Sequence, residues 1–176
     1  PGTGDDSVPE GQALVYQVTL SNPASTPTTL TFNVGGGTAG TGDIGTPVFS
    51  DGVTLNPNGT ITVPAGVTSF TVTVPTTQDT TDEPNETVPL TVGGVTGTGT
   101  IVDDDAPPSI SVNDVQVDES AGTATFTLTL SQASGQTVSV GWDTVAGSAQ
   151  AGADYTAAGG TVSFAPVAVV FVIGSK

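Results

Sequence analysis

Short runs in which apolar residues alternate with Thr, Ser or Gly recur along the chain, and they constrain its fold more than any other feature. Such runs occupy residues 13–20, 29–34, 59–63, 69–74, 87–92 and 97–102. Each is bounded by Gly, Pro, Asn or Asp, which favour turns. A period of two predicts half-buried β-strands, and no long window shows the 3.6-residue period of a helix. The sequence therefore predicts an all-β chain of antiparallel β-sandwiches.

The first part of the sequence recurs in the second part. PEGQALVYQVTLS (9–21) is matched by DESAGTATFTLTLS (118–131), LTFNVGGGTAGTGDI (30–44) by residues 138–155, and GTITVPAG (59–66) by residues 160–167. We therefore expect two copies of one module, residues 1–106 and 107–176. The second copy has no counterpart of residues 79–86 or 103–105, so we expect it to be C-terminally incomplete with an open sheet edge. Either the sequence is cut there, or something else supplies the missing strands.

The chain is strongly acidic. Its 176 residues include 17 Asp and Glu but one basic residue, Lys176, which gives a net charge of −16. Nucleic acids and anionic membranes are excluded as partners, because both are bound through clusters of Lys and Arg. Side chains of the protein cannot neutralise these carboxylates, so only water, counterions or bound metal ions remain. The absence of Cys favours an exported protein, and the missing initial Met indicates a piece of a longer chain.

Three consecutive aspartates, Asp103, Asp104 and Asp105, follow a predicted strand and precede two prolines. The loop 79–86 of the same copy is also acidic. Calcium prefers hard oxygen ligands, about six to eight of them, and the chain has no His or Cys to bind zinc or copper. The alternative is that the three aspartates form a solvated linker. Their position after a strand, in a module with an acidic loop, favours a metal site.

The order of these motifs resembles the Calx-beta domain. The motifs are an early Glu, the GSA and GADY segments within residues 147–155, TVSFAP (161–166), DTTDEPNE (79–86) and TIVDDD (100–105). The family is known from sodium–calcium exchangers and from tandem arrays in bacterial surface adhesins. The resemblance implies immunoglobulin-like β-sandwiches that bind calcium at the end where the last strand stops.

The resemblance also implies calcium ligands. They are Glu10, Asp79, Glu83, Asp103, Asp104 and Asp105. Weaker candidates are Asp82, Asp114, Asp118 and Glu119. A further acidic ligand of the family is missing, because Gly36 and Ala146 hold its place, and Gln78 replaces an aspartate of the acidic loop. These departures imply fewer ions or weaker binding.

The function that the resemblance implies is a calcium-binding structural extender of a large secreted bacterial adhesin of the repeats-in-toxin type. Calcium at module junctions would stiffen the chain at the bacterial cell surface, and the partners would be neighbouring modules of the same chain. The alternatives are a calcium-sensing module, as in sodium–calcium exchangers, and a carbohydrate- or ligand-binding sandwich. Catalysis is not expected without His, Cys, Arg or an internal Lys, and we expect Trp142 in the core.

Overall fold

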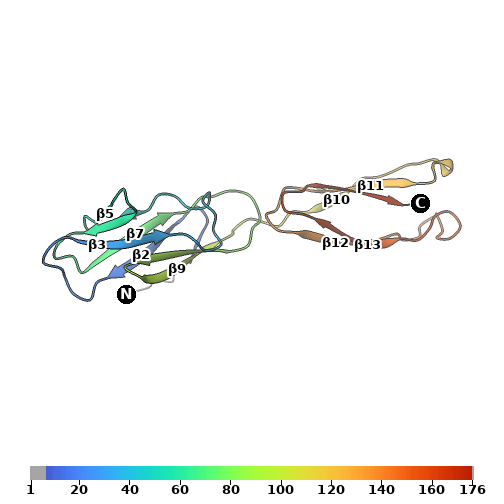
Figure 1. Cartoon of the computed structure of the whole chain (residues 1–176). Helices are drawn as coiled ribbons and strands as arrows, with labels where there is room; N and C mark the ends of the chain where they lie inside the picture. The colour runs from blue at the N-terminus through green and yellow to red at the C-terminus, as the bar shows by residue number, and fades with distance from the viewer. Residues whose placement is uncertain (1–6, 176) are drawn as a thin grey trace. The chain divides into compact units, whose positions relative to one another are not determined.

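The structure is a computed structural model that describes residues 7–175 (Figure 1). Two compact units are present. Unit 1 comprises the described residues up to Thr80 together with Pro84–Asp104, and unit 2 comprises Thr81–Glu83 and the described residues from Asp105 onward. Within the described part of the chain the only helix is the short 3-10 helix η1 (Glu119–Ala121), and no helix there is long and apolar enough to cross a membrane. The predicted all-β fold is confirmed.

Unit 1 is a sandwich of two sheets. Its strands are β1 (Ser7–Pro9), β2 (Ala13–Thr19), β3 (Thr28–Val34), β4 (Val48–Phe49), β5 (Thr54–Leu55), β6 (Thr60–Val63), β7 (Ser69–Pro75), β8 (Glu86–Val92) and β9 (Val95–Val102). One sheet has the order β1-β9-β8-β3-β6-β5 and the other β2-β7-β4. Neighbouring strands are antiparallel except β1 and β9, which are parallel. The strands predicted from the period of two are confirmed, whereas β1, β4 and β5 are too short for that signal.

The core of unit 1 lies between these sheets. Alternate residues of β7 and β8 point inward, so that Phe70, Val72 and Val88 are at most 1% exposed. The phenol of Tyr16 on β2 crosses the core and donates a hydrogen bond to the carbonyl oxygen of Val88 at 2.5 Å. A Cβ atom at Gly99 of β9 would lie 2.6 Å from this phenol oxygen, so glycine is required where β9 passes over Tyr16.

Replacing Tyr16 with Phe is expected to lower the free energy of unfolding of unit 1 by about 1 kcal/mol, because the buried carbonyl of Val88 loses its donor while the ring remains. Urea unfolding followed by far-UV circular dichroism measures this change. An unchanged unfolding midpoint would show that the bond between the two sheets does not contribute to stability.

Unit 2 is a smaller sandwich. Its strands are β10 (Ile110–Val112), β11 (Ala124–Leu130), β12 (Val138–Asp143), β13 (Gly159–Phe164) and β14 (Val170–Ser175). They form the sheets β10-β11-β14 and β12-β13. Leu128, Leu130, Val162 and Phe164 are its buried apolar residues, and Trp142 is partly buried against them. The expectation that Trp142 belongs to the core is therefore confirmed.

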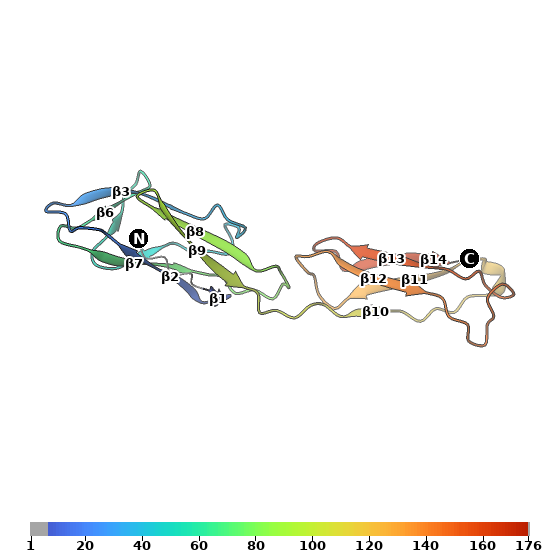
Figure 2. The same ribbon diagram turned by 90° about the horizontal axis from the view of Figure 1, so that it is seen from below.

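The strand pairings of unit 1 recur in unit 2. The pair β2–β7 corresponds to β11–β14, and β3–β6 corresponds to β12–β13. The hairpin of β8 and β9, visible in unit 1 in Figure 2, has no counterpart among the described residues of unit 2. The described residues of unit 2 therefore correspond to those of unit 1 up to β7.

Candidate metal centre

Glu10 lies at the end of β1, in the turn that leads into β2. Its backbone N–H donates to the carbonyl of Val102, the last residue of β9, at 3.2 Å. The turn continues through Gly11 with φ +73°, and a Cβ atom there would lie 3.0 Å from the Cβ of Gln78. Glycine thus allows both the left-handed backbone and the close approach of the loop between β7 and β8. Glu10 is held where β9 ends.

Asp79 lies in the loop between β7 and β8. The start of this loop is fixed by the N–H of Thr77, which donates to the carbonyl of Asp43 at 2.9 Å. The side-chain amide of Gln78 donates to Oδ1 of Asp104 at 3.0 Å. These bonds hold the loop next to the segment that follows β9.

The three consecutive aspartates after β9 have different surroundings. The N–H of Asp103 donates to the side-chain oxygen of Asn85 at 3.1 Å. Asp104 is exposed and accepts the bond from Gln78, whereas Asp103 and Asp105 are half-buried. Asp105 directly follows Asp104, the last residue of unit 1. The three residues are therefore not equivalent as ligands.

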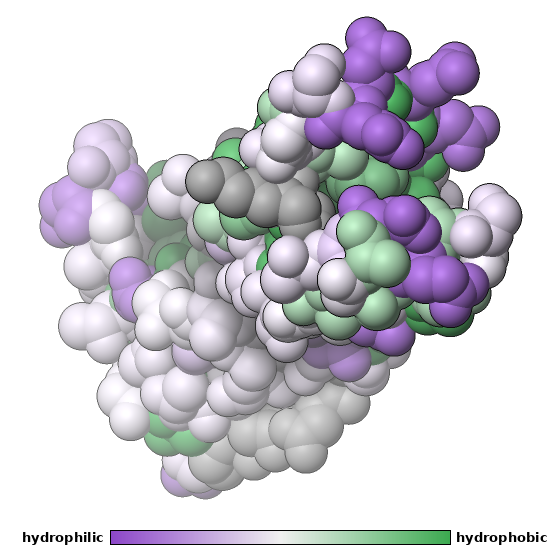
Figure 3. All heavy atoms as spheres, turned by 90° about the vertical axis from the view of Figure 1, so that its right-hand side faces the viewer, coloured by the Kyte–Doolittle hydropathy of each residue, from purple (hydrophilic) through white to green (hydrophobic). Residues whose placement is uncertain are grey.

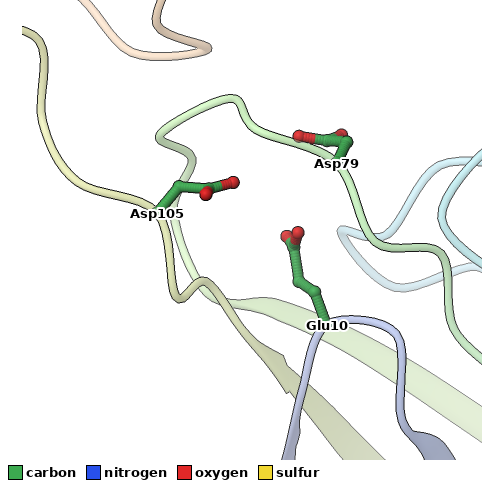
Figure 4. Close-up of side chains that lie close together, drawn as sticks. All are labelled: Glu10, Asp79 and Asp105. Atoms are coloured by element: carbon green, nitrogen blue, oxygen red, sulfur yellow. The ribbon is translucent and has the colours of Figure 1, made fainter.

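Glu10, Asp79 and Asp105 form an acidic cluster. Each offers one carboxylate oxygen, and these oxygens lie within 4.8 Å of one another. Figure 4 shows the three side chains pointing toward a common space, from the turn after β1, the loop before β8 and the segment after β9. Within residues 7–175, no other group of three or more acidic side chains has carboxylate oxygens that lie this close to one another. The structure thus brings together three of the six ligands that the resemblance implies.

The charges of the acidic cluster oppose one another. Two carboxylates about 5 Å apart repel by about 3 kcal/mol at an effective dielectric constant of about 20. Oε2 of Glu10 and Oδ2 of Asp105 are also buried, so water stabilises their charge less well. The sequence has a single basic side chain, Lys176, and a cation from solution is one source of balancing charge for this cluster.

The donor set fits calcium. Carboxylate oxygens are the ligands that calcium prefers, at about 2.3–2.6 Å and in flexible geometry. The cluster offers oxygen donors from loops, and the sequence contains no His or Cys that would favour zinc or copper. Three side chains supply fewer than the roughly six to eight ligands that calcium takes, so backbone carbonyls and water would complete its shell.

Asp82 and Glu83 make contacts in unit 2 instead. Asp82 is buried, and its Oδ2 accepts a hydrogen bond from the hydroxyl of Ser134 at 2.7 Å. The N–H of Gly135 donates to the carbonyl of Asp82 at 2.9 Å. A Cβ atom at Gly135 would lie 2.6 Å from a carboxylate oxygen of Glu83, so the two residues are closely packed. No feature of the sequence marked Ser134 or Gly135 as partners of this loop.

The weaker candidates lie apart from the acidic cluster. Asp114 is exposed in the segment after β10, Asp118 precedes η1, and Glu119 is its first residue. The carbonyl of Asp118 accepts a bond from the N–H of Ala121 at 2.9 Å, which closes the turn of η1. Asp118 and Glu119 both line a cavity within unit 2.

Replacing Gln78 with Asp is expected to raise the calcium affinity about threefold to tenfold, because the substitution adds a carboxylate beside the acidic cluster and removes the donor that occupies Asp104. Isothermal titration calorimetry of both proteins measures the change. Gln17→Asp in β2 is a matched control, because it adds the same charge on another part of unit 1. If the calcium affinity rises equally in Gln78→Asp and Gln17→Asp, the gain comes from the net charge of the protein and not from the site.

The family model of the Calx-beta domain matches residues 103–173, which cover most of unit 2 and the last two residues of unit 1. This segment is therefore similar to the Calx-beta domain. No curated protein matches the chain.

Three solved structures are similar to the chain. CBD12 from CALX1.2 is 19% identical over 97% of this chain and 70% of that chain, with a TM-score of 0.44. The calcium binding domain CBD12 of CALX1.1 is 19% identical over 97% of this chain and 71% of that chain, with a TM-score of 0.43. Domains 4–9 of the surface layer protein SbsC are 16% identical over 99% of this chain and 26% of that chain, with a TM-score of 0.33.

Proposed function

We propose that this chain consists of two Calx-beta-type modules and acts as a calcium-binding structural extender of a large secreted bacterial adhesin. The observation that carries the proposal is the acidic cluster of Glu10, Asp79 and Asp105 in a chain with a single basic residue. The match of residues 103–173 to the Calx-beta domain adds support for calcium as the ion.

Calcium would act on the connection between the modules. Asp105 is followed by Ala106, Pro107, Pro108 and Ser109. An ion bound by Glu10, Asp79 and Asp105 would fix the start of this connection to unit 1. The two prolines restrict the next backbone angles and favour an extended path. Without calcium, repulsion among the carboxylates would release Asp105 and let the connection bend.

An extracellular setting at the bacterial cell surface suits this role. Calcium-binding modules outside cells work at affinities of about 10⁻⁴–10⁻³ M, which a site with few protein ligands can reach. The partners would be neighbouring modules of the same chain, with no nucleic acid bound and no insertion into a membrane. The chain would hold another domain away from the cell and would carry out no catalysis.

Small-angle X-ray scattering with calcium and with a chelator tests the extender function. Calcium is expected to narrow the distribution of interatomic distances and to reduce the flexibility of the full chain. Asp105→Asn is expected to need at least about tenfold more calcium for the same change in scattering. Identical profiles of the unsubstituted chain with and without calcium, at calcium concentrations that saturate the site, would contradict the proposed function.

A calcium-sensing module is the second candidate, because the matched family is the Calx-beta domain. The two functions differ in affinity. A sensor works at about 10⁻⁷–10⁻⁵ M calcium, and an extracellular extender at about 10⁻⁴–10⁻³ M. A calorimetric dissociation constant in the lower range would favour the sensor over the extender.

A further inference from the structure

Few side chains of this protein can react without a partner molecule. The sequence has no Cys and no Met, so oxidation of sulfur has no target. Figure 3 shows a face that is mostly of intermediate hydropathy, with strongly hydrophilic side chains in a few separate groups. Among the described residues, such side chains are the carboxylates of Asp and Glu and the amides of Asn and Gln. Of these groups, the amide of an asparagine can react with the backbone that follows it.

Asn58 is the one asparagine of the sequence that a glycine follows, because the others precede Pro, Val, Glu or Asp. Asn58 and Gly59 lie in the turn between β5 and β6, and both are exposed. The N–H of Gly59 donates to the carbonyl of Asn56 at 3.0 Å, which closes the turn. Gly59 has φ +80°, and a Cβ atom there would meet nothing within 4 Å. The backbone nitrogen of Gly59 is therefore open to the side chain of Asn58.

The side-chain carbonyl of Asn58 accepts two hydrogen bonds from Thr60. The N–H of Thr60 donates to Oδ1 of Asn58 at 3.2 Å, and its hydroxyl donates to the same oxygen at 2.7 Å. This hydroxyl accepts a bond from the amide of Asn56 at 3.0 Å, and bonds in such a chain strengthen one another. Two donors on one carbonyl oxygen stabilise the negative charge that develops there when a nucleophile attacks the carbon.

We propose that Asn58 is the site of a spontaneous intramolecular deamidation, which the two hydrogen bonds from Thr60 accelerate. The backbone nitrogen of Gly59 loses its proton to hydroxide and forms a bond to Cγ of Asn58. The bond between Cγ and Nδ2 breaks, and Nδ2 takes a proton from water and leaves as ammonia. Water then opens the cyclic succinimide at one of its two carbonyl groups, which leaves aspartate or isoaspartate at position 58.

The reaction would change the hairpin of β5 and β6. Closure of the succinimide consumes the N–H that closes the turn, and isoaspartate adds a methylene group to the backbone there. β5 lies at the edge of its sheet and pairs with β6, with Leu55 opposite Ile61. Because the geometry of a turn sets the register of its hairpin, a longer turn is expected to loosen β5. This consequence is independent of calcium binding.

Mass spectrometry of the full chain, incubated at neutral and at mildly alkaline pH, measures the reaction. Cleavage by chymotrypsin after Leu55 and Phe70 releases a peptide that contains both Asn56 and Asn58. Asn56 is the matched control, because the nitrogen of Pro57 carries no proton to lose. We expect conversion at Asn58 and none at Asn56, with a rate that rises with pH because hydroxide removes the proton of Gly59.

Two variants test the role of Thr60. Thr60→Val keeps the branched shape and removes the hydroxyl donor, so the reaction is expected to slow about threefold to tenfold, the effect of one hydrogen bond. Thr60→Ser retains the hydroxyl and should react at nearly the original rate. Loosening of the turn would free the nitrogen of Gly59 and speed the reaction, so a slower rate in Thr60→Val would not come from lost stability.

The extra charge allows the converted protein to be separated by anion exchange. Hydrogen exchange of its Thr54 and Leu55 is expected to be faster than in the unconverted protein, because these residues form β5.

Three results would overturn the proposal. The first is conversion at Asn58 that does not exceed conversion at Asn56 after long incubation at alkaline pH. The second is an equal rate in Thr60→Val and in the unsubstituted chain, which would show that the hydroxyl does not assist the reaction. The third is unchanged hydrogen exchange in β5 of the converted protein.

Discussion

Asp105→Asn is expected to weaken calcium binding by at least about tenfold, which equals about 1.4 kcal/mol. The substitution keeps the shape of the side chain and removes one of the three charges that meet in the acidic cluster. Because Oδ2 of Asp105 is buried, the lost charge acted in a medium where attraction to an ion is stronger than in water. Glu10→Gln is expected to act similarly, and Asp79→Asn less, because Asp79 is exposed. Isothermal titration calorimetry measures each affinity.

Asp51→Asn is the matched control for this series. It removes the same charge from unit 1 at a turn between β4 and β5, outside the acidic cluster. Its φ of +55° is one that asparagine tolerates, so the turn should persist. An equal loss of calcium affinity in Asp51→Asn and in Asp105→Asn would show that the affinity depends on the overall charge of the protein. An unchanged calcium affinity in Asp105→Asn would show that Asp105 is not a calcium ligand.

Calcium at 100 times its dissociation constant is expected to raise the free energy of unfolding of unit 1 by about 2.7 kcal/mol. The folded unit brings the carboxylates of Glu10 and Asp79 together from a turn and a distant loop, whereas an unfolded chain does not hold them within ion-binding distance. Ions that bind the folded state alone shift the equilibrium toward it. Urea unfolding in calcium and in chelator, followed by circular dichroism, measures the difference.

Trp142 provides an internal control for this experiment, because it belongs to the core of unit 2. The unfolding midpoint followed by Trp142 fluorescence should shift less on calcium addition than the midpoint followed by circular dichroism, which also reports on unit 1. Asp105→Asn should lose at least about half of the stabilisation at the same calcium concentration, because its affinity is expected to be at least about tenfold weaker. A calcium effect of the same size in that variant would contradict a site made of Glu10, Asp79 and Asp105.

The strands that position the acidic cluster could be predicted from the sequence, because their side chains alternate between core and solvent. β7 and β8 show this directly, with every second residue buried. The short strand β1 could not be predicted, because three residues carry no measurable period, and its pairing with β9 joins residues far apart in the sequence. Glu10 could therefore be named as a ligand from the resemblance alone.

The members of the acidic cluster could be named only in part. The sequence marks three consecutive aspartates, but the partners that distinguish them come from other segments, with Asn85 bonded to Asp103 and Gln78 to Asp104. Similarly, the sequence alone predicts that the acidic residues of the loop 79–86 form one set of ligands. In the structure its residue Asp82 is bonded to Ser134, 52 positions away. A single sequence carries no signal for such distant contacts.

A crystal structure of the full chain grown with calcium tests the central claim most directly. The acidic cluster is expected to hold a calcium ion, with carboxylate oxygens of Glu10, Asp79 and Asp105 at about 2.3–2.6 Å from it. Anomalous scattering would identify the ion. A calcium ion bound elsewhere while these three carboxylates contact only water, at a calcium concentration well above the dissociation constant, would contradict the assignment of the site.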